Sequence, residues 1–197
     1  MPYLRISEAR SAGQTTRSYL SKSASQILAE DSRRFSPSDR YDVFLSHAYK
    51  DGEVILGVKS FIEAQGLTVY VDWIDDAGLD RGRMTRNTAK VLRERMRASS
   101  CLVYAYSANA GESLWMPWEL GYFDGFKPSF VWILPLVSES DSEFKGQEYL
   151  GLYPPVERIA SIGGRLNLGF TNFGDDNSEF PLTRAAKGTS GVHFVVK

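Results

Sequence analysis

The segment Glu112-Ser-Leu-Trp-Met-Pro-Trp-Glu-Leu-Gly-Tyr-Phe-Asp-Gly125 places two tryptophans, a tyrosine, a phenylalanine and a carboxylate within three or four turns of a predicted helix. At 3.6 residues per turn, Trp115 and Glu119 lie one turn apart on the same face. A carboxylate among aromatic side chains suits the binding of a sugar or of a planar cationic ring. The alternative is an amphipathic core helix with one stray acid, and the surrounding chain decides between the two.

The composition indicates an ordinary globular protein with one main domain. The chain has 197 residues, of which 43% are hydrophobic and 24% charged, and its formal net charge is −1. This near-neutral charge gives no reason to expect binding to nucleic acid or to an anionic membrane. No stretch approaches the roughly 20 apolar residues that a membrane span needs, and the N-terminus has no apolar signal core. We therefore expect a cytoplasmic protein, in which the single cysteine, Cys101, serves packing.

Four β-rich runs alternate with helical patterns in the middle of the chain. The runs are Tyr41–His47, Leu67–Asp72, Cys101–Tyr106 and Phe130–Leu136. Helices are predicted over 51–66, with Asp51 as a cap, over 88–98, and over the opening segment. Alternating strands and helices predict an α/β fold whose parallel sheet carries helices on both faces. Continuous apolar runs are typical of strands buried on both faces.

The two ends of the chain have weaker patterns. Residues 1–40 are predicted as an N-terminal arm with a peripheral helix at about 19–33. Residues 161–197 are predicted as a C-terminal extension that supplies the fifth strand. That strand lies at either 165–170 or 192–196, and the pattern leaves both open. A short helix is also expected near 155–161.

Topology predicts where a ligand would bind. In a five-stranded parallel sheet ordered 2-1-3-4-5, the ligand crevice lies at the carboxyl ends of strands one and three, where the strand order reverses. The residues that leave these two strands are Ser46, His47, Ala48, Ser107, Ala108 and Asn109. The helix that follows strand three carries Trp115 and Glu119, so we expect this carboxylate at the crevice.

Several segments resemble, in order and spacing, the conserved boxes of the Toll/interleukin-1 receptor (TIR) domain. The run 41–47 is similar to the first box, and 69–85 resembles the second strand with the BB loop that mediates TIR–TIR contacts. Trp115-Met-Pro-Trp-Glu119 matches the Trp-x-x-x-Glu motif of TIR domains that cleave NAD⁺. The resemblance covers about residues 41–160 and is closest to bacterial stand-alone TIR proteins, including those of Thoeris-type antiphage defence. It implies a flavodoxin-like three-layer sandwich.

The resemblance also implies roles for particular residues. Glu119 would be the catalytic glutamate, and loop 73–85 would mediate self-association. The candidate substrate contacts are Ser46, His47, Ala48, Asp72, Trp73, Ser107 and Trp115. NAD⁺ would be the substrate, no resident cofactor is expected, and no zinc-ligand spacing is present in the sequence. A separate effector protein would respond to the product.

The chemistry of NAD⁺ explains how one carboxylate could suffice. Ordinary glycoside hydrolysis uses two carboxyl groups, one of which protonates the leaving oxygen. The leaving group of NAD⁺ is already a pyridinium and departs as neutral nicotinamide, so no general acid is needed. One buried carboxylate near the ribose can stabilise the oxocarbenium-like centre. Capture by water gives ADP-ribose and capture by the adenine gives a cyclic product, and both stay open.

Alternatives exist for the function and for single residues. A non-catalytic TIR–TIR adaptor and a nucleoside deoxyribosyltransferase-like enzyme are the competing functions, whereas a dehydrogenase is disfavoured because no G-x-G-x-x-G follows the first strand. His47 could equally be a structural histidine satisfied by the backbone, and Asp72 could cap the polar loop. Of Trp115 and Trp118, one is expected in the core, and we assign Trp115 to the site.

Overall fold

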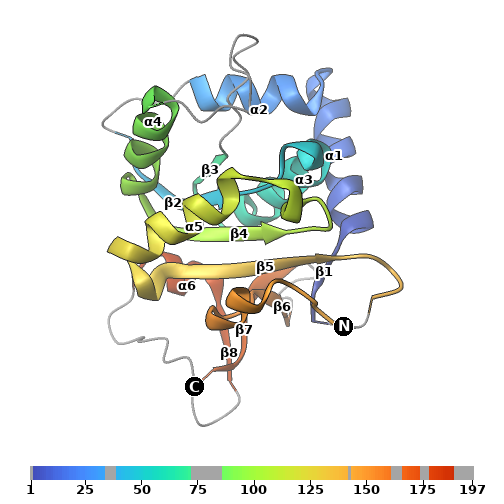
Figure 1. The fold of residues 1–197 in the computed structure, drawn as a ribbon. Helices are drawn as coiled ribbons and strands as arrows, with labels where there is room; N and C mark the ends of the chain where they lie inside the picture. The colour runs from blue at the N-terminus through green and yellow to red at the C-terminus, as the bar shows by residue number, and fades with distance from the viewer. Residues whose placement is uncertain are drawn as a thin grey trace.

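The main element of the fold is a five-stranded parallel sheet (Figure 1). The computed structural model describes residues 2–33, 39–71, 86–141, 143–160, 166–173 and 178–188. The strands of this sheet, in spatial order, are β1 (Leu4–Arg5), β5 (Val131–Val137), β4 (Ser99–Tyr106), β2 (Tyr41–Ser46) and β3 (Val69–Val71). The predicted order 2-1-3-4 of the first four expected strands is confirmed, as is the α/β fold class.

The fifth strand comes from the N-terminus rather than from the C-terminal extension. Leu4 pairs with Leu136, and Arg5 pairs with Val137, in parallel register. The prediction of a fifth strand at 165–170 is wrong, because most of this segment belongs to a strand of a second sheet. The alternative at 192–196 lies outside the described residues. A two-residue strand has too few residues to show a period in the sequence, which is why this pairing could not be predicted.

Helices cover both faces of the parallel sheet, as expected. One face packs against α1 (Ile6–Leu20), α2 (Ala24–Arg33) and α3 (Gly52–Glu63), and the other against α4 (Arg86–Arg97) and α5 (Trp115–Phe126). Successive side chains of a strand point to opposite faces. Val43 and Leu45 of β2 therefore join the first core, whereas Phe44 joins the second. Short 3₁₀ turns lie at Tyr49–Asp51, Ala110–Glu112, Pro128–Phe130 and Glu148–Leu152.

The N-terminal arm is an integral part of the fold, not a peripheral helix. It forms two helices, and α1 crosses α3 at two glycines, Gly13 and Gly57. A Cβ atom built on Gly57 would lie 1.8 Å from the carbonyl oxygen of Ala9, and one on Gly13 would lie 2.0 Å from that of Glu53. Only glycine permits so close an approach of two backbones. Small residues, rather than an apolar stripe, make this contact, so hydrophobic periodicity could not reveal it.

The C-terminal part forms a small antiparallel sheet beneath the parallel one (Figure 1). Its elements are β6 (Glu157–Ile159), β7 (Asn167–Phe173), β8 (Ser178–Pro181) and the following helix α6 (Leu182–Ala186). The short helix expected near 155–161 is therefore wrong, since part of that segment is β6. Phe170 of β7 packs edge-on against Trp132 of β5, with ring centroids 5.3 Å apart. The division of the chain at residues 40 and 160 stays a prediction.

None of the helices in the described parts of the chain is long and apolar enough to span a membrane.

Candidate active site

A buried serine–glutamate pair lies at the centre of the candidate site. Ser46 ends β2, and its Oγ donates a 2.6 Å hydrogen bond to Oε2 of Glu119 on α5. Only 1% of Ser46 and 4% of Glu119 is exposed to solvent. A buried carboxylate is costly without a donor, and a hydrogen bond to a charged group is shorter and stronger than a neutral one. The structure thus brings together two predicted site residues that lie far apart in the sequence.

Helix α5 turns Glu119 inward because of its local sequence. The Ser113 hydroxyl accepts a 3.3 Å hydrogen bond from the backbone N–H of Met116 and so satisfies one free donor at the helix start. Pro117 lies in the first turn, where a missing N–H costs nothing. The other buried side chains of α5 are Met116, Leu120 and Phe123. Glu119 therefore lies on the apolar face of the helix, against the sheet.

A second buried carboxylate joins the loops that leave β2 and β4. Asp51 accepts hydrogen bonds from Ser107 Oγ and, at 2.6 Å, from Asn109 Nδ2. The Asn109 N–H also donates to Ser107 Oγ at 3.1 Å. We call these three residues the Asp51 clamp. Ser107 was predicted as a substrate contact. Its hydroxyl instead donates to Asp51, and this contact fixes the spacing of the two loops.

The role expected for Asp51 was wrong. It occupies the residue before α3 as predicted, but its side chain makes no capping hydrogen bond to that helix. Its carboxylate binds the loop after β4 instead. Sequence analysis missed Asp51 and Asn109 as residues that shape the site, because side-chain hydrogen bonds between distant loops leave no periodic signal. At the rim of the same loops, exposed Lys50 and Glu112 form an ion pair, which contributes little in solvent.

Tyr104 lies beside the serine–glutamate pair and was also missed. In the sheet it pairs with Ser46 of β2 and with Ile133 of β5. It is fully buried, and within the described structure its hydroxyl forms no hydrogen bond of ordinary geometry, although the Tyr149 hydroxyl lies close enough to interact with it. Burial raises the pKa of this phenol far above its ordinary value, and the Tyr149 hydroxyl and the charge of Glu119 raise it further. Tyr104 is therefore a neutral hydroxyl next to the carboxylate.

Of the remaining predicted substrate contacts, His47 and Ala48 lie in the described part of the chain, whereas Asp72 and Trp73 do not. His47 is half-buried, and its Nδ1 lies 3.2 Å from the carbonyl oxygen of Leu45, as a histidine satisfied by the backbone would. Ala48 is buried in the core beneath α4 and α5. Asp72, Trp73 and the rest of loop 73–85 lie outside the described residues. Their roles stay predictions.

Aromatic side chains form a row along the outer side of α5. Trp115 and Trp118 contact edge-on at 5.7 Å, and Trp118 stacks on Tyr122 at 5.7 Å. Arg93 of α4 lies over the Trp118 ring at 5.3 Å. Both tryptophans are half-buried and pack against the core beneath α4 and α5, so the assignment of one to the core and of Trp115 to the site stays a prediction. Residues three apart on a helix lie only about 60° apart around its axis, so both rings share one side.

Across the described parts of the chain, no group of three or more His, Cys, Asp or Glu side chains is placed to hold a metal ion. Among the described residues, the groups that lie together at the end of β2 are the buried Glu119 carboxylate, the Ser46 hydroxyl and the neutral Tyr104 phenol.

Comparison with known proteins identifies the family. Residues 43–160 match the TIR domain family. A Bacillus cereus protein named "Probable 3' cyclic ADP-D-ribose synthase ThsB'" is 49% identical over 138 residues, which cover 70% of this chain and 71% of that protein. A Cytobacillus dafuensis protein named as a proposed cyclic ADP-D-ribose synthase, TIR2, is 36% identical over 83 residues, or 42% of this chain and 22% of that protein.

Among solved structures, the TIR domain of the Toll-related receptor TRR-2 from Hydra magnipapillata is 18% identical, with a TM-score of 0.41 over 58% of this chain and 83% of that one. The family match spans more than half of the chain, and it includes both Ser46 and Glu119. The chain belongs to the TIR domain family.

Proposed function

We propose that this TIR protein cleaves the nicotinamide–ribose bond of NAD⁺ with Glu119 as the catalytic carboxylate. One observation carries the proposal: Glu119 is buried, hydrogen-bonded to Ser46, and located where the strand order of the sheet reverses. The names of the two bacterial relatives, both cyclic ADP-ribose synthases, support the same reaction. Their names also favour a cyclic ADP-ribose-type product over free ADP-ribose.

In the proposed reaction the C–N bond between ribose and nicotinamide breaks, and its electron pair leaves with the nicotinamide nitrogen. The pyridinium thereby becomes neutral, so no proton has to be supplied to it. The positive charge left on the ribose is stabilised by Glu119, which Ser46 orients. Attack by a nucleophile of the same molecule closes the ring and releases one proton, whereas attack by water gives ADP-ribose.

The proposal extends to partners and location. The product acts as a signal for a separate effector protein, as in the antiphage systems that the sequence resembles. The protein works in the cytoplasm and self-associates through its TIR domain, with loop 73–85 as the contact. It needs no cofactor besides the substrate.

The test is incubation of the purified protein with NAD⁺, followed by chromatography of nicotinamide, ADP-ribose and cyclic products. Glu119→Gln keeps the shape of the side chain and removes its charge, so we expect nicotinamide release to be abolished while circular dichroism stays unchanged. Glu94→Gln, an exposed glutamate on neighbouring α4, is the matched control and keeps full activity. Undiminished NAD⁺ loss in folded Glu119→Gln would refute the assignment. Inactivity of the unaltered protein even when concentrated would favour the adaptor function.

A further inference from the structure

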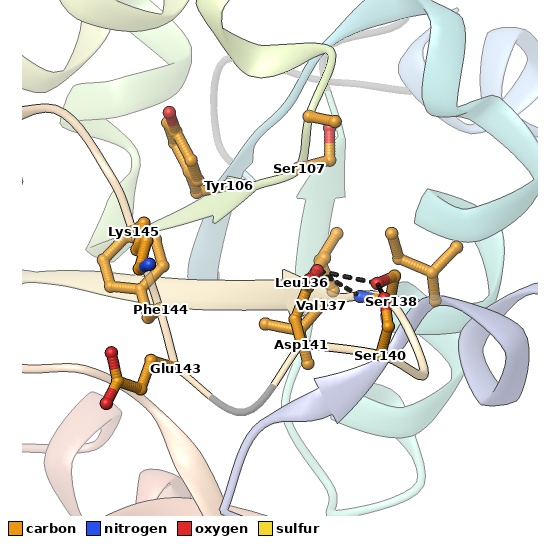
Figure 2. A pocket seen from close by; sticks show the side chains of 12 residues that line it. Tyr106, Ser107, Leu136, Val137, Ser138, Ser140, Asp141, Glu143, Phe144 and Lys145 are labelled. Atoms are coloured by element: carbon orange, nitrogen blue, oxygen red, sulfur yellow. Dashed lines mark hydrogen bonds between the residues drawn. The ribbon is translucent and has the colours of Figure 1, made fainter.

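A cavity opens at the carboxyl end of the sheet, on the β5 side of β4. It has a volume of about 450 Å³, within the range of small-molecule sites. Figure 2 shows residues that leave β4 and β5 converging on it, together with side chains of residues 138–141 and 143–145. Ser46 lies on the other side of β4, and neither it nor Glu119 lines the cavity. The serine–glutamate pair therefore lies outside this cavity.

One wall of the cavity is aromatic. Tyr106 and Phe144 contact edge-on, with ring centroids 5.3 Å apart (Figure 2). Tyr104 stacks behind Tyr106 at 6.4 Å and 18°, and Tyr3 supports Phe144 edge-on at 6.3 Å. Four rings thus hold one another in place. Such a wall presents a fixed flat surface on which a planar ring can stack.

The loop that forms the opposite wall is organised by its own hydrogen bonds. Ser138 Oγ donates to Asp141 Oδ2 at 2.7 Å and lies 2.9 Å from Ser140 Oγ. Arg5 Nη1 donates to the carbonyl oxygens of Ser138 and Asp141. The hydrogen bonds from Ser138 lower the pKa of Asp141, so this carboxylate stays charged and already has donors. These hydrogen bonds fix Ser138, Ser140 and Asp141 relative to one another and to Arg5.

Two charged side chains at the cavity remain available. Across the described residues, Glu143 and Lys145 make no hydrogen bond and no ion pair, and both line the cavity. The charged residues that line the cavity are two carboxylates, Asp141 and Glu143, and one ammonium group, Lys145, while Arg5 lies behind the loop. The cavity therefore suits a ligand with one anionic group and several hydroxyls better than a polyanion.

We propose that this cavity is a binding site for a nucleoside monophosphate. The base stacks on Tyr106 and Phe144, the ribose hydroxyls donate to Glu143, and Lys145 binds the phosphate. The site lies outside the proposed catalytic centre. It shares with that centre the loop after β4, because Ser107 both lines the cavity and belongs to the Asp51 clamp.

The test uses adenosine monophosphate as the probe, measured by isothermal titration calorimetry without any NAD⁺. We expect binding to the unaltered protein and equal binding to Glu119→Gln. Phe144→Ala and Lys145→Ala should each weaken binding about tenfold or more, since each removes a stacking or charge-assisted contact. The matched controls are Phe126→Ala and Lys90→Ala, which lie on α5 and α4 away from the cavity.

Further probes test the contributions of the nucleoside and of the phosphate to binding separately. Adenosine should bind more weakly than adenosine monophosphate, and Lys145→Ala should affect only the phosphate-bearing probe. Absence of binding would overturn the proposal, as would binding that is unchanged in both Phe144→Ala and Lys145→Ala but lost in Glu119→Gln. Thermal denaturation of each variant confirms that it is folded. Because no turnover is measured, this outcome is independent of whether the protein cleaves NAD⁺.

Discussion

Ser46 Oγ lies 2.6 Å from Glu119 Oε2, so the last residue of β2 holds the one carboxylate on the buried face of α5. The contact joins the first TIR box to the Trp-x-x-x-Glu motif, two segments that the sequence separates by 73 positions. It orients the carboxylate and gives it a hydrogen-bond donor. A reaction that passes through a cationic ribose needs a carboxylate held in a fixed position.

Removal of the Ser46 hydroxyl should therefore slow the reaction without unfolding the protein. A hydrogen bond to a charged group contributes about 1.5–3 kcal/mol, so Ser46→Ala should reduce nicotinamide release about tenfold to hundredfold. Ser99→Ala is the matched control, because Ser99 is equally buried at a strand end but donates to the carbonyl oxygen of Arg95. Equal rates in both variants would show that Ser46 does not assist Glu119.

The Asp51 clamp should contribute to stability. Asp51→Ala leaves Ser107 and Asn109 without their acceptor, and we expect the free energy of unfolding to fall by about 1–3 kcal/mol in urea denaturation. Asp51→Asn keeps one carbonyl acceptor. Its free energy of unfolding should therefore lie between those of the unaltered protein and Asp51→Ala. If Asp51→Ala is as stable as the unaltered protein, the hydrogen bonds of the clamp do not hold the loops together.

The crossing of α1 and α3 should not tolerate a methyl group. Gly57→Ala would place Cβ 1.8 Å from the backbone oxygen of Ala9, so the two helices would have to separate. We expect a loss of about 1–3 kcal/mol in unfolding free energy, as in overpacked cores. Gly121→Ala is the control, because nothing lies within 4 Å of its Cβ position on α5. There alanine should stabilise the helix by about 0.5–1 kcal/mol, and opposite signs for the two variants would confirm the contact.

Tyr104→Phe should leave the stability unchanged or raise it. The phenol oxygen is buried and forms no hydrogen bond of ordinary geometry within the described structure, so its interaction with the Tyr149 hydroxyl does not offset the cost of burial, which phenylalanine avoids. The ring remains to stack on Tyr106. Chemical denaturation measures the effect, and a loss above about 1 kcal/mol would mean that the hydroxyl has a partner.

Alkaline pH should destabilise the folded protein partly through Tyr104. Burial raises the pKa of Tyr104 above its ordinary value of 10.0. The unfolded chain therefore loses this proton at a lower pH than the folded chain does. The contribution of the protonated Tyr104 phenol to the free energy of unfolding is complete below about pH 10. It decreases as the pH rises toward the pKa of Tyr104 in the folded state. Urea midpoints measured from pH 8 to 11 should fall less steeply for Tyr104→Phe than for the unaltered protein; parallel curves would contradict this.

The parallel sheet could be predicted because its strands are continuous apolar runs separated by amphipathic helices. Phe44 and Leu45, for example, both belong to a buried run, and each is buried on a different face. The position of Glu119 followed from the same pattern, because a parallel sheet with this strand order has only one point of reversal. Hydrophobic periodicity and the order of strands and helices along the chain can both be read from residues that are close in the sequence.

Contacts between distant polar or small residues could not be predicted in this way. Asp51 was expected to cap a helix because the local sequence shows only the helix that follows it, whereas its partners lie 56 and 58 positions away. Gly13 and Gly57 carry no side chain, so their contact has no hydrophobic signal. Tyr104 resembles any aromatic residue of a strand until its pairing with Ser46 is known.

The pairing of Leu4 with Leu136 has a consequence for how the protein is made. The ribosome releases β1 first, yet its partner strand emerges 132 positions later, and no other strand of the described sheet pairs with β1. Strand β1 must therefore wait while α3, β4 and α5 are synthesised, and its attachment to the edge of the sheet is a late step of assembly. A bulky fusion placed before Pro2 would interfere with this last step rather than with the core that forms earlier.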